Sequence, residues 1–157
     1  MSVRQSFASR VASAAVVLLA LLVGSSAALA DSGSSRAGAL YVTKECSQYT
    51  GAAGSFCTIT SSNIPWIRAG MRVVYADAAN FGTTPPMLDT DVVLSAGHGS
   101  AAYGHVTLNI ATAQGTITFD GGTGAFAMFQ GSANVTVDAD GVWHWDGTYS
   151  FNRLPPR

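Results

Sequence analysis

Charged residues are scarce in this chain. They make up 11% of its 157 residues, with eight basic residues against nine acidic ones. The basic residues form no run and no stripe, so neither nucleic acid nor an anionic membrane surface is an expected partner. The sequence also lacks a P-loop, a dinucleotide fingerprint and a nucleophile elbow, and no cofactor is expected. These absences argue against the common nucleotide-dependent and hydrolase classes.

Long hydrophobic runs are equally scarce. The only one, Val11 to Val23, follows the basic residues Arg4 and Arg10 and precedes Ala28-Leu29-Ala30, a small-x-small cleavage site. This order predicts a secretory signal peptide. A retained anchor is the alternative, but it needs about 20 apolar residues. We therefore expect a chain secreted to the cell exterior or periplasm, with no membrane partner when mature. Its parts are a removed signal peptide (1–30), a flexible leader (31–39) and one folded domain (40–157).

Cysteine is limited to Cys46 and Cys57. Two sulfurs cannot complete a tetrahedral metal site, and no histidine lies near them in the sequence. Export would place both in an oxidising compartment, which favours a disulfide between them. This bond would tie the N-terminal segment to a strand at 56–61.

Strand periodicity, by contrast, is abundant. Between Gly104 and Phe151 apolar and polar residues alternate, with Gly-rich turns and no helical period. A period of two gives each strand one apolar and one polar face. The expected strands are 40–43, 56–61, 71–76, 90–95, 103–111, 116–120, 131–138 and 142–151.

About eight strands in one small domain predict an all-β fold, a single closed antiparallel barrel, because closure removes exposed strand edges. The alternation also predicts which side chains are buried in it. They are Val106, Leu108, Ile110, Ile117, Phe119, Val135, Val137, Trp143 and Trp145.

The turn Gly121-Gly122-Thr123-Gly124-Ala125-Phe126 lies between two expected strands, with Gly131 shortly after it. In this setting it resembles a turn of the allene oxide cyclase and dirigent protein superfamily. Ile67 to Tyr75 is similar to a segment that opens a barrel strand in plant cyclases, and Gly141 to Phe151 looks like the last strand of bacterial cyclase-barrel-like proteins. The resemblance implies an eight-stranded barrel with an apolar central cavity, usually trimeric. A homotrimer or homodimer is thus a candidate assembly.

The chain departs from that family at its N-terminal strand. Plant cyclases carry a catalytic Glu in a Tyr-Glu-x-Asn context, whereas Tyr41-Val42-Thr43-Lys44 has neither the Glu nor the Asn. A jasmonate-type substrate is therefore not expected. Dirigent proteins place Asp and Arg residues in the cavity, and Arg72 with Asp77 or Asp91 could imitate them.

The side chain of Arg72 can point either into the barrel or into solvent. If Arg72 and Val74 face the interior, the guanidinium needs an anionic partner or ligand. If Val73 and Tyr75 face inward instead, Arg72 lies in solvent, which is favoured because arginine is rarely buried unpaired.

The candidate catalytic residues are Arg72, Asp77 and Asp91. An aspartate acting as acid or base needs burial to raise its pKa towards neutrality, and turn formation is the other explanation for these positions. We expect an apolar pocket at the barrel end near Arg72, away from the aromatic run 143–151. The candidate ligand-binding residues are Tyr75, Val74, Phe119 and Trp143.

The histidines indicate no metal site. His98 lies between glycines in a turn, and His105 and His144 occupy polar positions of the alternation. Nothing in their spacing requires them to converge on a metal. His105 and His144 are expected on the outer face.

Two function classes remain open. The first is an enzyme of isomerase or cyclase type, or a chirality-directing protein, that holds a small apolar ligand while it cyclises or couples. The second is a non-catalytic secreted barrel that binds a lipophilic ligand or a partner protein. A buried Arg/Asp pair at a cavity mouth would favour the first, and a filled interior the second.

Overall fold

The computed structural model describes residues 36–152. The expected signal peptide lies outside these residues. The first strand begins at Ala37, so the end of the expected flexible leader is part of the sheet. The strands are β1 (Ala37–Glu45), β2 (Phe56–Ser62), β3 (Arg72–Tyr75), β4 (Met87–Gly97), β5 (Ser100–Asn109), β6 (Gln114–Thr123), β7 (Phe129–Val137) and β8 (Trp143–Phe151).

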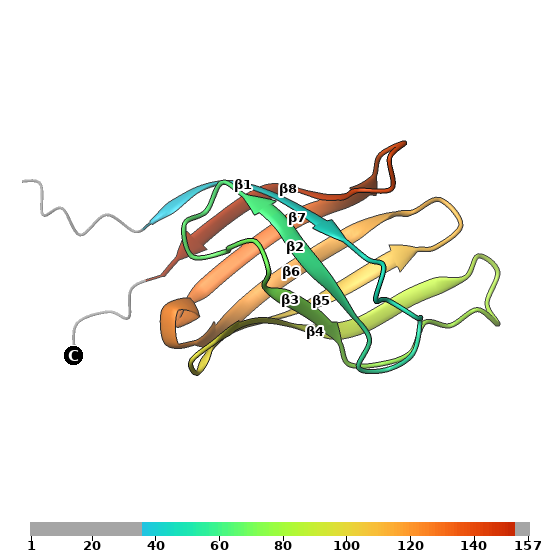
Figure 1. The fold of residues 1–157 in the computed structure, drawn as a ribbon, viewed down its shortest axis with the longest axis horizontal. Coiled ribbons are helices and arrows are strands. Elements are labelled where there is room, and N and C mark those ends of the chain that lie inside the picture. The colour runs from blue at the N-terminus through green and yellow to red at the C-terminus, as the bar shows by residue number, and fades with distance from the viewer. Residues whose placement is uncertain (1–35, 153–157) are drawn as a thin grey trace, which may run out of the picture. The chain divides into compact units, whose positions relative to one another are not determined.

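These strands form one closed antiparallel barrel, as the sequence predicts. Each strand pairs with its neighbours in the chain, and β1 closes the ring by pairing with β8 from Ala37↔Ser150 to Lys44↔Trp143. Figure 1 shows the meander, with β1 lying beside β8. A single 3₁₀ turn, η1 (Gly124–Phe126), separates β6 from β7. The predicted absence of longer helices between Gly104 and Phe151 is confirmed.

The predicted register is correct. Val106, Leu108, Ile117, Phe119, Val135 and Trp145 are buried in the barrel, while His105, Thr107, Thr116 and Thr118 are exposed. Ile110, Val137 and Trp143 lie at strand ends or beyond them and are only half-buried. Burial thus follows alternation in the middle of β5, β6 and β7 and becomes intermediate towards the strand ends.

The two ends of the barrel differ in chemistry. One end, here called the aromatic end, carries a cluster in which Phe129 contacts Phe126 and Phe151, and Trp66 packs on Phe151 with ring centroids 5.3 Å apart. The opposite end, the disulfide end, carries the Cys46–Cys57 bond. In Figure 1 η1 and the β4–β5 turn lie at the first end, and the β5–β6 and β7–β8 turns lie at the other.

The turn after β6 requires glycine at position 124 for steric reasons. Gly124 has φ of 57°, and a Cβ there would lie 2.3 Å from the Ser100 Oγ and 3.0 Å from its Cα. A side chain at this position therefore meets both backbone strain and overlap.

We expect Gly124→Ala to lower the free energy of unfolding by about 2 to 4 kcal/mol. Gly141→Ala is the matched control, because Gly141 also has positive φ (80°) but its Cβ would meet nothing within 4 Å. The control should lose about 1 kcal/mol from backbone strain alone. Urea unfolding of both variants measures the difference, and equal losses would show that the contact with Ser100 is unimportant.

Candidate functional site

The interior of the disulfide end contains a lysine. Leu40 and Val42 of β1 point into the barrel, and Lys44 continues the same face because strand side chains alternate. Lys44 is only 4% exposed and is the sole lysine of the sequence. The strand thus carries a single amine into an apolar core.

Lys44 is held by a hydroxyl and by aromatic rings. Its Nζ donates a hydrogen bond to the Tyr75 hydroxyl at 2.7 Å. The same nitrogen lies 5.4 to 5.5 Å from the ring centroids of Tyr75, Trp143 and Trp145. Such rings stabilise a cation through their quadrupoles, but less than water does. Within residues 36–152 every side-chain ion pair involves a histidine, so no carboxylate neutralises Lys44.

Burial shifts the proton equilibria of both partners. It lowers the pKa of Lys44 from 10.5 to about 7, because the ammonium form has lost its hydration. It also raises the pKa of the Tyr75 hydroxyl, with a smaller contribution from Tyr49. Near neutral pH the pair therefore consists of a neutral phenol and an amine that is partly unprotonated.

A short loop covers this pair. Residues 47–55, here called the disulfide loop, lie between Cys46 and Cys57, whose Cα atoms are 4.2 Å apart. Within the loop, Tyr49 packs edge-on against Tyr75 with ring centroids 4.8 Å apart. Its hydroxyl is buried and has no hydrogen-bond partner among the described residues. The loop therefore adds an unsatisfied polar atom beside the Lys44–Tyr75 pair.

The middle of the barrel and its aromatic end are filled by side chains. Phe119 lies between Phe129 and Trp145, with ring centroids 5.5 and 5.6 Å away. Trp145, Phe126 and Phe129 are among the largest fully buried side chains. The aromatic residues of β8 run the length of the barrel, so Trp143 lies at the disulfide end and does not fill the aromatic end with Phe151. The polar interior is thus confined to one end.

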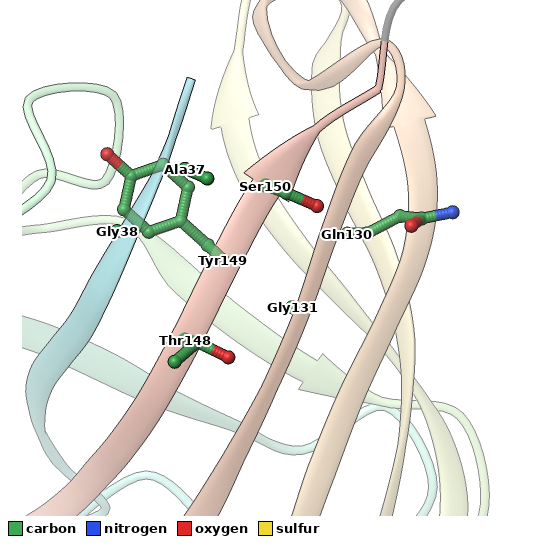
Figure 2. A pocket seen from close by; sticks show the side chains of 7 residues that line it. All are labelled: Ala37, Gly38, Gln130, Gly131, Thr148, Tyr149 and Ser150. Carbon is green, nitrogen blue, oxygen red and sulfur yellow. The ribbon is translucent and has the colours of Figure 1, made fainter. Parts of the chain in front are cut away.

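Several hollows lie on the outer surface of the described residues, and three of them have volumes between about 350 and 510 Å³. One of about 510 Å³ runs over β1, β7 and β8, and its lining includes the exposed side chains of Gln130 and Thr148 (Figure 2). A second, of about 500 Å³, includes Arg68 to Arg72 and Ser95 to His98. The third is described with Asp91 below. All three are open to solvent and lie outside the sheet.

Arg72 takes the outward alternative. Its side chain is exposed and its guanidinium stacks over the Phe56 ring at 4.4 Å, while Val73 and Tyr75 face the interior. Arg72 pairs with Ser95 on one side and with Thr58 on the other, so it lies beside the second surface hollow and on the outer face of the sheet, whereas Lys44 is on the inner face. The interior cation of this barrel is Lys44.

Neither candidate aspartate forms an ion pair with Arg72 among the described residues. Asp77 follows β3, is exposed, and accepts a hydrogen bond from Thr90 Oγ1 at 3.2 Å. Asp91 is exposed on the outer face of β4. The expected Arg/Asp pair at a cavity mouth is therefore absent from the described residues, because Arg72 stacks on Phe56, Asp77 bonds to Thr90 and Asp91 bonds to His105.

Asp91 instead belongs to an outer-face cluster centred on His105. The His105 ring nitrogens bond to Asp91 at 2.9 Å and to Asp89 at 2.6 Å, and these bonds raise the pKa of His105. Asp91, His105, Tyr103 and other residues line the third hollow, of about 350 Å³. His105 is on the outer face, as predicted. No group of three or more His, Cys, Asp or Glu side chains within the described part of the chain could hold a metal ion.

The candidate ligand-binding residues divide between the two faces of the sheet. Tyr75 and Phe119 are buried inside, and Trp143 lines the disulfide end over Lys44. Val74 lies on the opposite face of β3 from Tyr75 and is half-buried. Tyr75 and Trp143 therefore both contact Lys44, which is not among the candidate residues.

Lys44 is not among the residues predicted from the sequence, because the family motif that corresponds to Tyr41 to Lys44 contains Glu and Asn and has no lysine. The alternation Leu40, Val42, Lys44 carried the relevant signal, since it places the lysine on the buried face. The predicted disulfide Cys46–Cys57 is confirmed, with both sulfurs 3.7 to 3.8 Å from the Lys44 Nζ.

Comparison with known proteins gives a likeness in structure. No protein-family model and no curated protein sequence matches the chain. Among solved structures, the chain is similar to a pterocarpan synthase dirigent protein at 14% identity and a TM-score of 0.46, over 76% of this chain and 90% of that one. The assignment as a closed eight-stranded antiparallel barrel rests on the strand pairing described above. No helix of the described residues is long and apolar enough to cross a membrane.

Proposed function

We propose that this barrel binds a small, largely apolar molecule carrying one carbonyl or anionic oxygen, and that the oxygen lies at the Lys44–Tyr75 pair. The observation that carries the proposal is a fully buried amine with no carboxylate partner among the described residues. An apolar side chain of similar volume would make a more stable core. A buried polar group that costs stability is a feature of functional sites.

The surroundings of Lys44 suit such a ligand. An ammonium has three donors, and only the one to Tyr75 is used in a strong hydrogen bond, since contacts with sulfur at 3.7 to 3.8 Å are weak. A ligand oxygen would accept a second, charge-assisted bond. The rings of Trp143 and Trp145 offer apolar walls, and the Tyr49 hydroxyl offers another donor.

Entry would occur at the rim of the disulfide end. Tyr49 and Trp143 are both half-buried, so they are the aromatic side chains of the site nearest to solvent. We propose that they move aside when the ligand enters, because the remaining interior is occupied by packed rings. The ligand is therefore small, with most of its apolar surface against these two side chains.

We further propose that the protein acts outside the cytoplasm. A disulfide persists in oxidising compartments, which supports this location together with the expected signal peptide. Cyclisation or stereoselective coupling of the ligand, the finer cyclase- or dirigent-like proposal, would arise from restricting its conformers between the rings. Binding alone, the non-catalytic alternative, requires nothing more than the site described.

Calorimetric titration with hexanoate, compared with hexanol, tests the proposal. The oxidised protein should bind hexanoate more tightly, and Lys44→Met should weaken hexanoate binding about 10- to 100-fold, the effect of losing one charge-assisted hydrogen bond. Arg68→Met, which removes an exposed cation, is the matched control and should bind as the wild type does. Equal affinity of wild type and Lys44→Met for hexanoate would refute the proposed site.

A further inference from the structure

Lys44 has the properties of a nucleophilic amine as well as those of a hydrogen-bond donor. At pH 7 the amine is neutral in about half of the molecules, because burial lowers the pKa of Lys44 to about 7. The groups packed against it are Tyr75 from β3, Tyr49 through Tyr75, the disulfide, and the two indoles of β8. None of these is an anion at neutral pH, so nothing nearby restores the ammonium form.

We infer that Lys44 forms an imine with the aldehyde or ketone group of a carbonyl ligand. This inference rests on the ligand site proposed above and specifies the chemistry of its oxygen. The supporting geometry is a single buried amine 2.7 Å from a phenolic hydroxyl, within a box of aromatic rings. Lysine amines made neutral by apolar surroundings are suited to this reaction.

The reaction needs no redox partner. The lone pair of the neutral Nζ forms a bond to the carbonyl carbon, the carbonyl π electrons move to oxygen, and one proton passes from nitrogen to oxygen to give a carbinolamine. The C–O bond then breaks as oxygen takes a second proton, and water leaves while the nitrogen lone pair forms the C=N bond. The nitrogen gives up its remaining proton, which balances the proton taken by oxygen. One amine and one carbonyl thus give one imine and one water.

Tyr75 is placed to assist the reaction as a hydrogen-bond donor. Its hydroxyl accepts the hydrogen bond from Nζ and can donate its own hydrogen to the oxygen bound at the reacting carbon. Its raised pKa keeps it protonated and therefore able to donate. The aromatic walls keep water scarce, which favours loss of water and slows hydrolysis of the imine.

The sole lysine makes the test unambiguous. The full-length oxidised protein is incubated at pH 7 with hexanal and sodium cyanoborohydride, which reduces an imine to a stable secondary amine, and adducts are located by peptide mass spectrometry. Besides Lys44, only the N-terminal α-amino group can react, and it serves as the internal standard. We expect a Lys44 adduct whose rate saturates with hexanal and rises with a midpoint near pH 7.

Variants separate this chemistry from simple binding. Lys44→Arg should lose the internal adduct and keep the N-terminal one. Tyr75→Phe should slow the Lys44 reaction about tenfold relative to the N-terminal one, while its urea midpoint shows that the barrel is still folded. Absence of a Lys44 adduct in the folded protein, when the urea-unfolded chain is labelled, would overturn the inference. So would an adduct that does not saturate and has a midpoint near 10, since that is ordinary lysine reactivity.

The two proposals fail separately. Hexanoate binding that depends on Lys44, without a Lys44 adduct, would overturn imine formation and leave the binding function standing. Loss of both would overturn the site itself.

Discussion

Replacing Lys44 by methionine is expected to stabilise the protein at pH 6 by several kcal/mol and to abolish a rise in stability that the wild type shows above pH 7. Methionine has a similar length and no charge to desolvate, so the core keeps its packing and loses the buried ammonium. The gain in stability accompanies the loss of hexanoate binding expected above. One residue would then be unfavourable for the fold and necessary for the site.

The direction of the pH dependence follows from the two pKa values of Lys44. In the folded protein the pKa is about 7, and in the unfolded chain it is near the ordinary value of 10.5. Between these values the unfolded chain binds more protons, so the free energy of unfolding rises with pH by up to about 1.4 kcal/mol per pH unit. Over the whole window this amounts to about 5 kcal/mol. Below pH 7 both states are protonated and the cost of the buried ammonium is fully present.

Urea unfolding at intervals from pH 6 to 9.5 measures this effect. The upper limit avoids ionisation of tyrosine in the unfolded chain, where the raised pKa of Tyr75 would begin to favour unfolding. Lys44→Met retains Tyr75 and all carboxylates, so the difference between the two proteins isolates Lys44. Arg68→Met should keep the wild-type slope. Parallel curves for wild type and Lys44→Met would show that Lys44 is not desolvated in solution.

The fold could be predicted from the sequence because each strand carries its own alternation. Val106 and Leu108 are buried and Thr107 is exposed for a local reason, the period of two, and this local signal is consistent with closure into a barrel. The disulfide could also be predicted, because two cysteines allow only one intramolecular pairing. The burial pattern depends only on residues adjacent in the sequence, and the disulfide depends only on the presence of two cysteines.

The site could be predicted only in part, because it depends on which strands meet. Tyr75 was identified from its own strand, but its partner Lys44 lies 31 residues away and reaches it only through the barrel. Arg72 is a candidate because both faces of its strand carry apolar residues, so the sequence does not determine which face points into the barrel. Its contact with the Phe56 ring, which stabilises the outward position, depends on the pairing of β2 with β3. Long-range pairing of this kind is not contained in the local pattern.

Removal of the disulfide should have the second large effect. We expect Cys46→Ala/Cys57→Ala to lose about 3 kcal/mol of unfolding free energy, because the bond closes a short loop and restricts the unfolded chain. Wild type reduced with dithiothreitol is the matched comparison, since it keeps both sulfur atoms in the core. Urea unfolding of the oxidised, reduced and doubly substituted proteins gives the three values.

The same proteins test whether the disulfide loop covers Lys44. One side of the loop is held by backbone hydrogen bonds, Gly54 N–H to the Tyr75 carbonyl and Tyr75 N–H to the Ser55 carbonyl, and the other side is held by the disulfide. Reduction releases only the second side, so Tyr49 should leave Tyr75 more often while the barrel stays folded. Reductive methylation of Lys44 by formaldehyde should then be several-fold faster in the reduced protein than in the oxidised one, relative to the N-terminal amine. A stability loss without faster methylation would mean that the loop contributes to the fold but does not control access to the amine.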